Sequence, residues 1–172
     1  MNRRLTLMTG AAVAAGAAGA GVAWWRLGFG RQPDDAEIWS MRFDRPDGSQ
    51  LTLADFRGKP LLLNFWATWC PPCIRELPLI DSFQREHRAR GWQVVGLAVD
   101  KLEPVREFLA KQPVGFGVGL AGIEGVELSR HLGNTSGALP FSVVFDRQGR
   151  IVQRKLGVIQ TEDLAHWVAA IG

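Results

Sequence analysis

Cys70 and Cys73 are the only cysteines in this chain of 172 residues, and Pro71 and Pro72 separate them. They lie within the stretch NFWATWCPPCIRELP, residues 64–78. A pair at this spacing can be a structural disulfide, part of a metal site or a redox-active dithiol. A disulfide between these two positions closes too small a loop to stabilise a fold substantially, which disfavours a purely structural role.

A metal site needs more ligands than two cysteines supply, because a structural zinc ion takes four. The three histidines, His87, His131 and His166, are scattered, and none stands at a Cys/His spacing typical of a metal centre. A peroxide-reducing cysteine would complete a Pro-x-x-x-Thr-x-x-Cys pattern, which the residues before Cys70 do not supply. We therefore expect no metal site, and we favour a redox-active pair that needs no cofactor besides its own disulfide.

The cysteines are placed where a buried strand gives way to a helix. Residues 61–67, LLLNFWA, form the continuous apolar run expected of a strand buried on both faces. Residues 72–90 carry apolar side chains at three-residue steps, which predicts a helix that Gly91 ends. The free N–H groups and the dipole at a helix N-terminus favour thiolate, the attacking species. We expect Cys70 to be the nucleophile and Cys73 to resolve the mixed disulfide.

Strand and helix patterns alternate along a single predicted domain, residues 37–172, which follows a linker, residues 26–36. The Pro-Asp-Gly turn in DRPDGS joins two strand-like runs into a predicted hairpin, and the RQG turn joins a second. Two strands and two short helices are expected over residues 92–133. Thr161 is the candidate N-cap of a last helix. This order predicts an α/β fold with helices on both faces of a mixed sheet.

Residues 1–25 have the features of a targeting segment. Arg3 and Arg4 precede a run of about 21 residues without charge, rich in alanine and glycine. The run is long enough to span a bilayer, and its small residues offer cleavage sites. We expect export to the periplasm by the Sec or the twin-arginine route. The exported protein is then either soluble after cleavage or anchored to the inner membrane by residues 5–25.

Composition bounds the choice of partners. Apolar residues make up 47% of the chain, which is enough for a substantial core, and 20 Lys and Arg against 17 Asp and Glu give a net charge of +3. Surfaces that bind nucleic acid combine clustered basic residues with interleaved aromatic ones. The sequence has no such pattern, so we do not expect a nucleic-acid partner.

The cysteine motif resembles that of the thioredoxin superfamily, and within it the TlpA/ResA-like exported thiol–disulfide oxidoreductases. The similarity runs from LTLADFRGKP to the C-terminus. It implies a thioredoxin-like mixed sheet with helices on both faces, in which residues 94–132 form a central strand–helix insertion. It also implies that Trp69, Cys70 and Cys73 belong to the redox centre and that Pro78 kinks the active-site helix.

The resemblance extends to a second segment, GALPFSVVFD. Pro140 corresponds to the cis-proline that the superfamily places opposite the cysteines, and Leu139 would offer its backbone to a substrate strand. We expect Trp69 to pack over the disulfide and Trp66 to face the core. The cytochrome c maturation branch favours a Pro-Glu pair at the cis-proline, but Phe141 follows Pro140 here, which makes that branch a poorer match.

One position departs from the cytosolic thioredoxins, which carry a buried aspartate in the strand before the motif. That position holds Asn64, which cannot exchange a proton. A glutamate three residues after the second cysteine is typical of the exported branch, and Glu76 matches it. We predict that Glu76 handles the proton of Cys73, with a pKa raised by burial beside the thiol. The alternative is that Glu76 is a solvated helix charge paired with Arg75 or another neighbour.

The residues between the cysteines bear on the direction of electron flow. Pro71 and Pro72 lack N–H groups that could solvate the Cys70 sulfur, and no histidine stands between the cysteines. A less stabilised thiolate makes a couple more reducing. We therefore expect a reductase of protein disulfides that a membrane-embedded electron donor recharges. A dithiol oxidant and a metallochaperone-like thiol-binding module on the same fold are the alternatives.

Overall fold

A seven-stranded mixed sheet forms the middle layer of the computed structural model, which describes residues 37–171. Its strands are β1 (Arg42–Asp44), β2 (Gln50–Thr52), β3 (Leu61–Trp66), β4 (Gln93–Ala98), β5 (Gly117–Leu120), β6 (Phe141–Phe145) and β7 (Ile151–Leu156). They follow the order β2-β1-β5-β4-β3-β6-β7. The three central strands β5, β4 and β3 pair in parallel, whereas β6 runs antiparallel to both β3 and β7.

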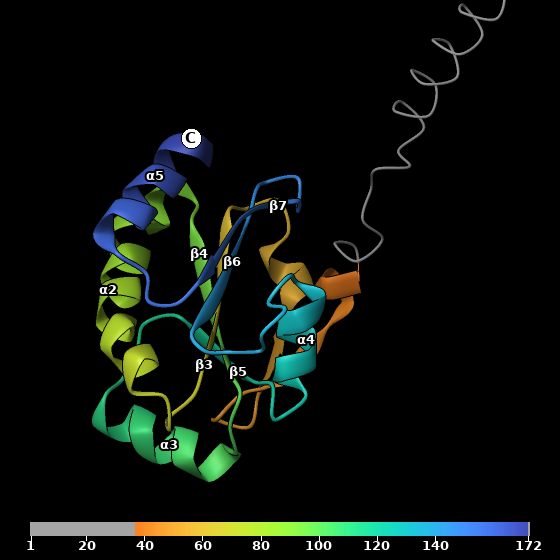
Figure 1. Ribbon diagram of the computed structural model, residues 1–172, viewed down its shortest axis with the longest axis vertical. Coiled ribbons are helices and arrows are strands. Elements are labelled where there is room, and N and C mark those ends of the chain that lie inside the picture. The colour runs from red at the N-terminus through yellow and green to blue at the C-terminus, as the bar shows by residue number, and fades with distance from the viewer. Residues whose placement is uncertain (1–36, 172) are drawn as a thin grey trace, which may run out of the picture. The chain divides into compact units, whose positions relative to one another are not determined.

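Helices lie on both faces of this sheet (Figure 1). They are α2 (Pro71–His87), α3 (Leu102–Lys111), α4 (Gly125–His131) and α5 (Thr161–Ile171), with 3-10 turns at Glu37–Ser40, Leu53–Phe56 and Arg88–Arg90. Leu77 of α2, Val105 of α3 and Leu164 of α5 belong to one core cluster. On the opposite face, Leu128 of α4 and Ile38 pack into a second cluster. The expected α/β fold with helices on both faces of a mixed sheet is confirmed.

Strand β3 lies between the two clusters and contributes side chains to both, and all six of its side chains are buried. Because successive side chains of a strand point to opposite faces, Leu63 and Phe65 pack on the α4 side and Leu62 packs on the α2 side. Asn64 is the only polar side chain of the strand, and it contacts Glu76 of α2. The otherwise apolar strand β3 thus places one polar side chain, Asn64, in the core beneath α2.

Several element ends differ from the sequence-based prediction. The long helix ends at His87, and a 3-10 turn continues to Arg90 before Gly91, whose φ of 90° closes the segment. The N-cap expected at Thr161 is wrong, because Thr161 is already the first residue of α5. The side chain of Asp163 instead accepts a hydrogen bond from the backbone N–H of Gln160 at 2.8 Å. The predicted segments 1–25 and 26–36 lie outside the described residues.

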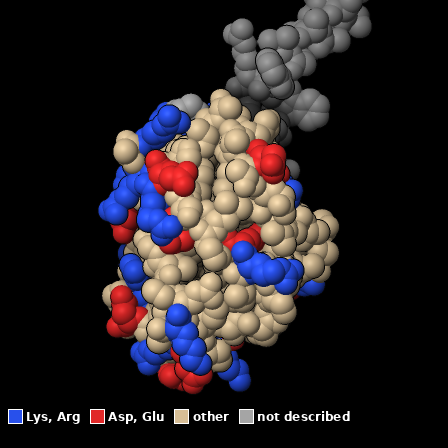
Figure 2. Space-filling view, turned by 90° about the vertical axis from the view of Figure 1, so that its left-hand side faces the viewer, with Lys and Arg blue, Asp and Glu red and all other residues tan. Residues whose placement is uncertain are grey.

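Basic and acidic side chains are interspersed on the face shown in Figure 2, so the basic side chains do not form one continuous patch there. Within residues 37–171, no helix combines the length and the apolar character needed to cross a membrane. The segment predicted from the sequence as an anchor is not among these residues.

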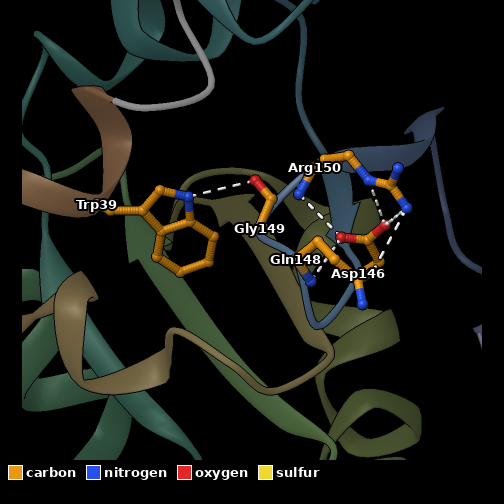
Figure 3. Close-up of polar contacts among 5 residues, drawn as sticks. All are labelled: Trp39, Asp146, Gln148, Gly149 and Arg150. Atoms are coloured by element: carbon orange, nitrogen blue, oxygen red, sulfur yellow. Dashed lines mark hydrogen bonds and ion pairs between the residues drawn. The ribbon is translucent and has the colours of Figure 1, made fainter.

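The turn between β6 and β7 is built around one carboxylate (Figure 3). Oδ1 of Asp146 accepts the backbone N–H groups of Gln148 at 2.9 Å and Arg150 at 3.0 Å, while Oδ2 accepts the Arg150 guanidinium. Burial alone would raise the pKa of Asp146, but these hydrogen bonds and the Arg150 charge hold it below its ordinary value. The carbonyl of Gly149 accepts the Trp39 indole N–H at 3.3 Å, which ties the turn to the N-terminal part of the domain.

Replacing Asp146 should therefore weaken the fold. We expect Asp146→Ala to lower the free energy of unfolding by about 1–3 kcal/mol, because it leaves two backbone N–H groups without their acceptor. Asp146→Asn keeps an oxygen acceptor for the two backbone N–H groups and loses the charge and the acceptor of the Arg150 guanidinium, so its loss should be smaller. Urea denaturation of the oxidised protein measures both values. A loss below about 0.5 kcal/mol for Asp146→Ala would show that the turn does not depend on this side chain.

Candidate redox site

Cys70 and Cys73 form a disulfide at the N-terminus of α2. Cys70 is the N-cap residue, with an extended backbone, and Pro71 begins the helix. Both sulfur-bearing residues are nearly enclosed, with 4% of Cys70 and none of Cys73 exposed. Cys70 is thus the more accessible cysteine, as expected for the nucleophile, although only slightly.

The helix N-terminus offers few backbone donors to the Cys70 sulfur. An N-cap side chain normally accepts the N–H of the second or third helical residue. Here the second residue is Pro72, which has no N–H. The third is Cys73, whose N–H donates to the Cys70 sulfur at 3.3 Å. The sequence therefore leaves one of the two usual capping donors in place.

Asp100 fixes the loop that leads from β3 to the cysteines. Its Oδ2 accepts both the backbone N–H of Thr68 at 2.9 Å and the Thr68 hydroxyl at 2.5 Å. The backbone N–H of Val99 donates to the carbonyl of Trp66 at 2.8 Å, beside the same loop. Asp100 was not predicted from the sequence. Its signal is a carboxylate that follows a buried parallel strand, at the sheet edge where β3 also ends.

The Leu139–Pro140 segment reaches the same edge of the sheet. Phe65, near the end of β3, pairs with Phe141, the first residue of the antiparallel strand β6. The loop after β3 and the segment before β6 therefore meet. The Leu139–Pro140 peptide bond is cis, as the resemblance implies, and Leu139 packs against the core cluster that contains both cysteines.

The two tryptophans of the motif have different surroundings. Trp66 is fully buried, as expected, and its ring lies 5.4 Å from that of Phe108. Trp69 is 63% exposed, so most of its ring faces solvent directly beside Cys70. Its expected packing over the disulfide stays a prediction. The exposed ring is an apolar surface next to Cys70.

Glu76 is a buried carboxyl group one helical turn beyond Cys73. Only 2% of the residue is exposed, so the alternative of a solvated helix charge is wrong. Residues three apart share a face of a helix, which puts Glu76 and Cys73 on the buried side of α2. Oε1 accepts from Asn64 Nδ2 at 2.8 Å, and Oε2 accepts the backbone N–H of Ile159 at 2.7 Å.

Burial raises the pKa of Glu76 to about 7, against the opposing effects of these two hydrogen bonds and of the Lys155 charge. A carboxyl group with such a pKa can take up or release a proton near neutral pH. The expectation of a raised pKa therefore has a structural basis.

Ser142 and Lys155 were not predicted from the sequence. Both lie on the same face of the sheet as Asn64. Ser142 is fully buried on β6 and accepts a hydrogen bond from Asn64 Nδ2 at 3.0 Å. Lys155 on β7 pairs with Asp163 of α5 at 2.8 Å. The signal for Ser142 is a serine inside the apolar run FSVVF. That it contacts Asn64 depends on the register between β3 and β6, which the sequence does not give.

The described part of the chain holds no group of three or more His, Cys, Asp or Glu side chains able to bind a metal ion. The fold and its cysteine pair are those of the thioredoxin-like thiol–disulfide oxidoreductases. The family model described as Redoxin matches residues 34–171, so the chain belongs to the Redoxin family.

Relatives and solved structures agree with this class. A thiol-disulfide oxidoreductase ResA of Bacillus cereus is 30% identical over 127 residues, which cover 73% of this chain and 70% of that protein. ResA of Geobacillus kaustophilus is also 30% identical over 127 residues, covering 72% of this chain and 70% of its own. The chain is thus a thiol–disulfide oxidoreductase.

Two structures illustrate the similarity of the fold. A thiol:disulfide interchange protein of the thioredoxin family from Chlorobium tepidum TLS superposes with a TM-score of 0.69 at 28% identity, covering 77% of this chain and 92% of that one. StoA from Bacillus subtilis superposes with a TM-score of 0.60 at 23% identity, over 74% of this chain and 95% of its own. The second comparison concerns the fold alone.

The pKa of Glu76 predicts how stability depends on pH. Between pH 4.5, its ordinary value, and about 7, the folded protein holds a proton that the unfolded chain has released. The stability that this protonated carboxyl group contributes to the folded protein is fully present below pH 4.5 and is lost as the pH rises through about 7. Over this window the wild type should lose roughly 3 kcal/mol more stability than Glu76→Gln.

Denaturant unfolding of the oxidised protein at several pH values measures this difference. Glu86→Gln is the matched control, because Glu86 is an exposed carboxylate on the same helix. It should keep the slope of the wild type. Parallel curves for the wild type and Glu76→Gln would mean that the pKa of Glu76 is the same in the folded and the unfolded protein.

Proposed function

We propose that the protein is an exported, periplasmic reductase of protein disulfides. The observation that carries the direction is the N-terminus of α2, where Pro72 removes one capping donor and only the Cys73 N–H reaches the Cys70 sulfur. Hydrogen bonds to a charged group are stronger than those to a neutral one. The missing donor therefore destabilises the thiolate relative to the disulfide, and the couple becomes more reducing.

The first step is attack by the reduced enzyme on a client. The Cys70 thiolate forms a bond to one sulfur of the client disulfide, and the client S–S bond breaks. One client sulfur leaves as a thiolate and takes a proton, while the other is held in a mixed disulfide with Cys70. The exposed Trp69 ring and the Leu139 backbone are the groups proposed to contact the client.

The second step releases the client. Cys73 gives its proton to the ionised carboxylate of Glu76, and its sulfur attacks Cys70. The Cys70–Cys73 disulfide forms, and the second client sulfur leaves as a thiolate that takes a proton from water. Glu76 then releases the proton it took from Cys73 to water, which restores its carboxylate. The client gains two electrons and two protons in total, and the enzyme dithiol loses the same number.

A further turnover needs two electrons from a dithiol reductant, because the enzyme ends as a disulfide. In an oxidising compartment this reductant must be dedicated, and we propose that a membrane-embedded donor supplies the electrons. The predicted segment 1–25 supports an extracytoplasmic location, whether it is cleaved or retained as an anchor.

Cysteine variants test the mechanism. Cys70→Ser should reduce the rate of insulin reduction to the uncatalysed level, because no nucleophile remains. Cys73→Ser should accumulate a mixed disulfide with the client, visible on non-reducing gels, because release is blocked. Glu86→Gln serves as the control with wild-type turnover.

Turnover by Cys70→Ser would contradict the assignment of the nucleophile. If the wild type binds copper(I) tightly and reduces insulin no faster than the control without enzyme, the thiol-binding alternative holds instead.

Proline variants test the direction of electron flow. Pro72→Ala restores the N–H of the second helical residue, so it should stabilise the Cys70 thiolate and raise the reduction potential by roughly 30 mV. Pro71→Ala restores the N–H of the first residue, which does not normally reach an N-cap side chain, and it should shift the potential much less. Redox titration against glutathione measures all three proteins. A wild-type potential near about −120 mV would identify a dithiol oxidant.

A further inference from the structure

A row of polar side chains crosses the face of the sheet that packs against α2 and α5. Asn64 on β3 is the register partner of Ser142 on β6, which is the partner of Lys155 on β7. The adjacent row on the same face begins with Leu62 and Val144, both fully buried and apolar. The polar row is therefore a local exception in an apolar layer, and it lies against Glu76.

The hydrogen bonds of this row suit an ionised Glu76. Nδ2 of Asn64 donates to Glu76 Oε1 at 2.8 Å and to Ser142 Oγ at 3.0 Å. Oε2 of Glu76 accepts from the Ile159 N–H at 2.7 Å. Both carboxyl oxygens are acceptors here, as a carboxylate requires. Oδ1 of Asn64, however, is buried and has no hydrogen-bond partner among the described residues.

A neutral Glu76 cannot keep this arrangement. Because Oε2 faces the Ile159 N–H, the added proton belongs on Oε1, where it would meet the Nδ2 donor of Asn64. A half-turn of the Asn64 amide exchanges the places of its nitrogen and oxygen. Oδ1 then accepts the carboxyl proton, and the atom that was unpartnered gains a partner.

The hydroxyl of Ser142 accommodates both orientations of the amide. A hydroxyl group accepts from Nδ2 in one orientation and donates to Oδ1 in the other. One amide atom stays unpartnered in either orientation, so the charge on Glu76 selects between them. An alanine at this position would pair with neither amide atom, and a lysine could only donate.

We propose that Asn64 and Ser142 form a hydrogen-bond switch whose orientation follows the protonation of Glu76. They are positioning residues: the switch gives the carboxyl group a buried partner in both of its charge states. The charged groups that face this site from the neighbouring elements are Lys155 of β7 and its partner Asp163 of α5. Its value in catalysis rests on the proposed role of Glu76 as the proton acceptor of Cys73.

Nuclear magnetic resonance of the labelled, oxidised full chain tests the switch without a client. At pH 9 the Asn64 amide protons should show nuclear Overhauser contacts to the β-protons of Ser142. At pH 5 these contacts should weaken several-fold, with the same midpoint as the carboxyl carbon of Glu76. Unchanged contacts while that carbon titrates would overturn the proposal, and so would a carbon that does not titrate over this range.

Two variants sharpen the test. Glu76→Gln presents a permanent N–H donor to Asn64, so the contacts to Ser142 should stay weak at every pH. Glu86→Gln should keep the pH-dependent change of the wild type. The measurement involves no thiol exchange, so a failed insulin assay would refute the proposed function and leave this result standing. If Glu76→Gln does not fold, the wild-type titration alone decides.

Discussion

The structure around the cysteine pair depends on one buried carboxyl group, that of Glu76, which needs hydrogen-bond partners. Burying a carboxylate without partners is strongly unfavourable. Glu76 meets this requirement with the side chain of Asn64 on one oxygen and the backbone N–H of Ile159 on the other. One side chain of α2 is thereby joined to the central strand and to the segment that precedes α5. The position of the active-site helix on the sheet and the chemistry of Glu76 are set by the same contacts.

This arrangement costs stability at neutral pH. A pKa near 7 means that the folded protein resists ionisation of Glu76 more than the unfolded chain does. An apolar residue at this position would extend the cluster formed by Leu77 and Ile80. Local rules of stability are often broken at functional sites. A buried carboxyl group on the same helix face as Cys73, with a pKa that burial raises to about 7, fits that pattern.

Much of the fold and the core of the site could be predicted from the sequence, because their signals are local. The apolar run of β3, the helix after the cysteines and the RQG turn all depend on neighbouring residues. The contact between Asn64 and Glu76 could not be derived, although both residues were singled out. It depends on how α2 packs on the sheet. Ser142 and Asp100 escaped notice for the same reason, since register and loop closure bring them to the site.

Cys70 and Glu76 differ in how many hydrogen-bond donors the fold gives them. Cys70 lacks one donor, because Pro72 occupies the helix position whose N–H would donate a hydrogen bond to the Cys70 thiolate. At Glu76 the fold supplies hydrogen-bond partners, the Asn64 side chain and the Ile159 N–H, and the proposed switch would supply one in each charge state. In the proposed mechanism the Cys70 sulfur must remain reactive, whereas the Glu76 carboxyl group must remain in place while it gains and loses a proton. A helix that begins with two prolines and carries a hydrogen-bonded glutamate one turn beyond its second cysteine meets both requirements within its first two turns.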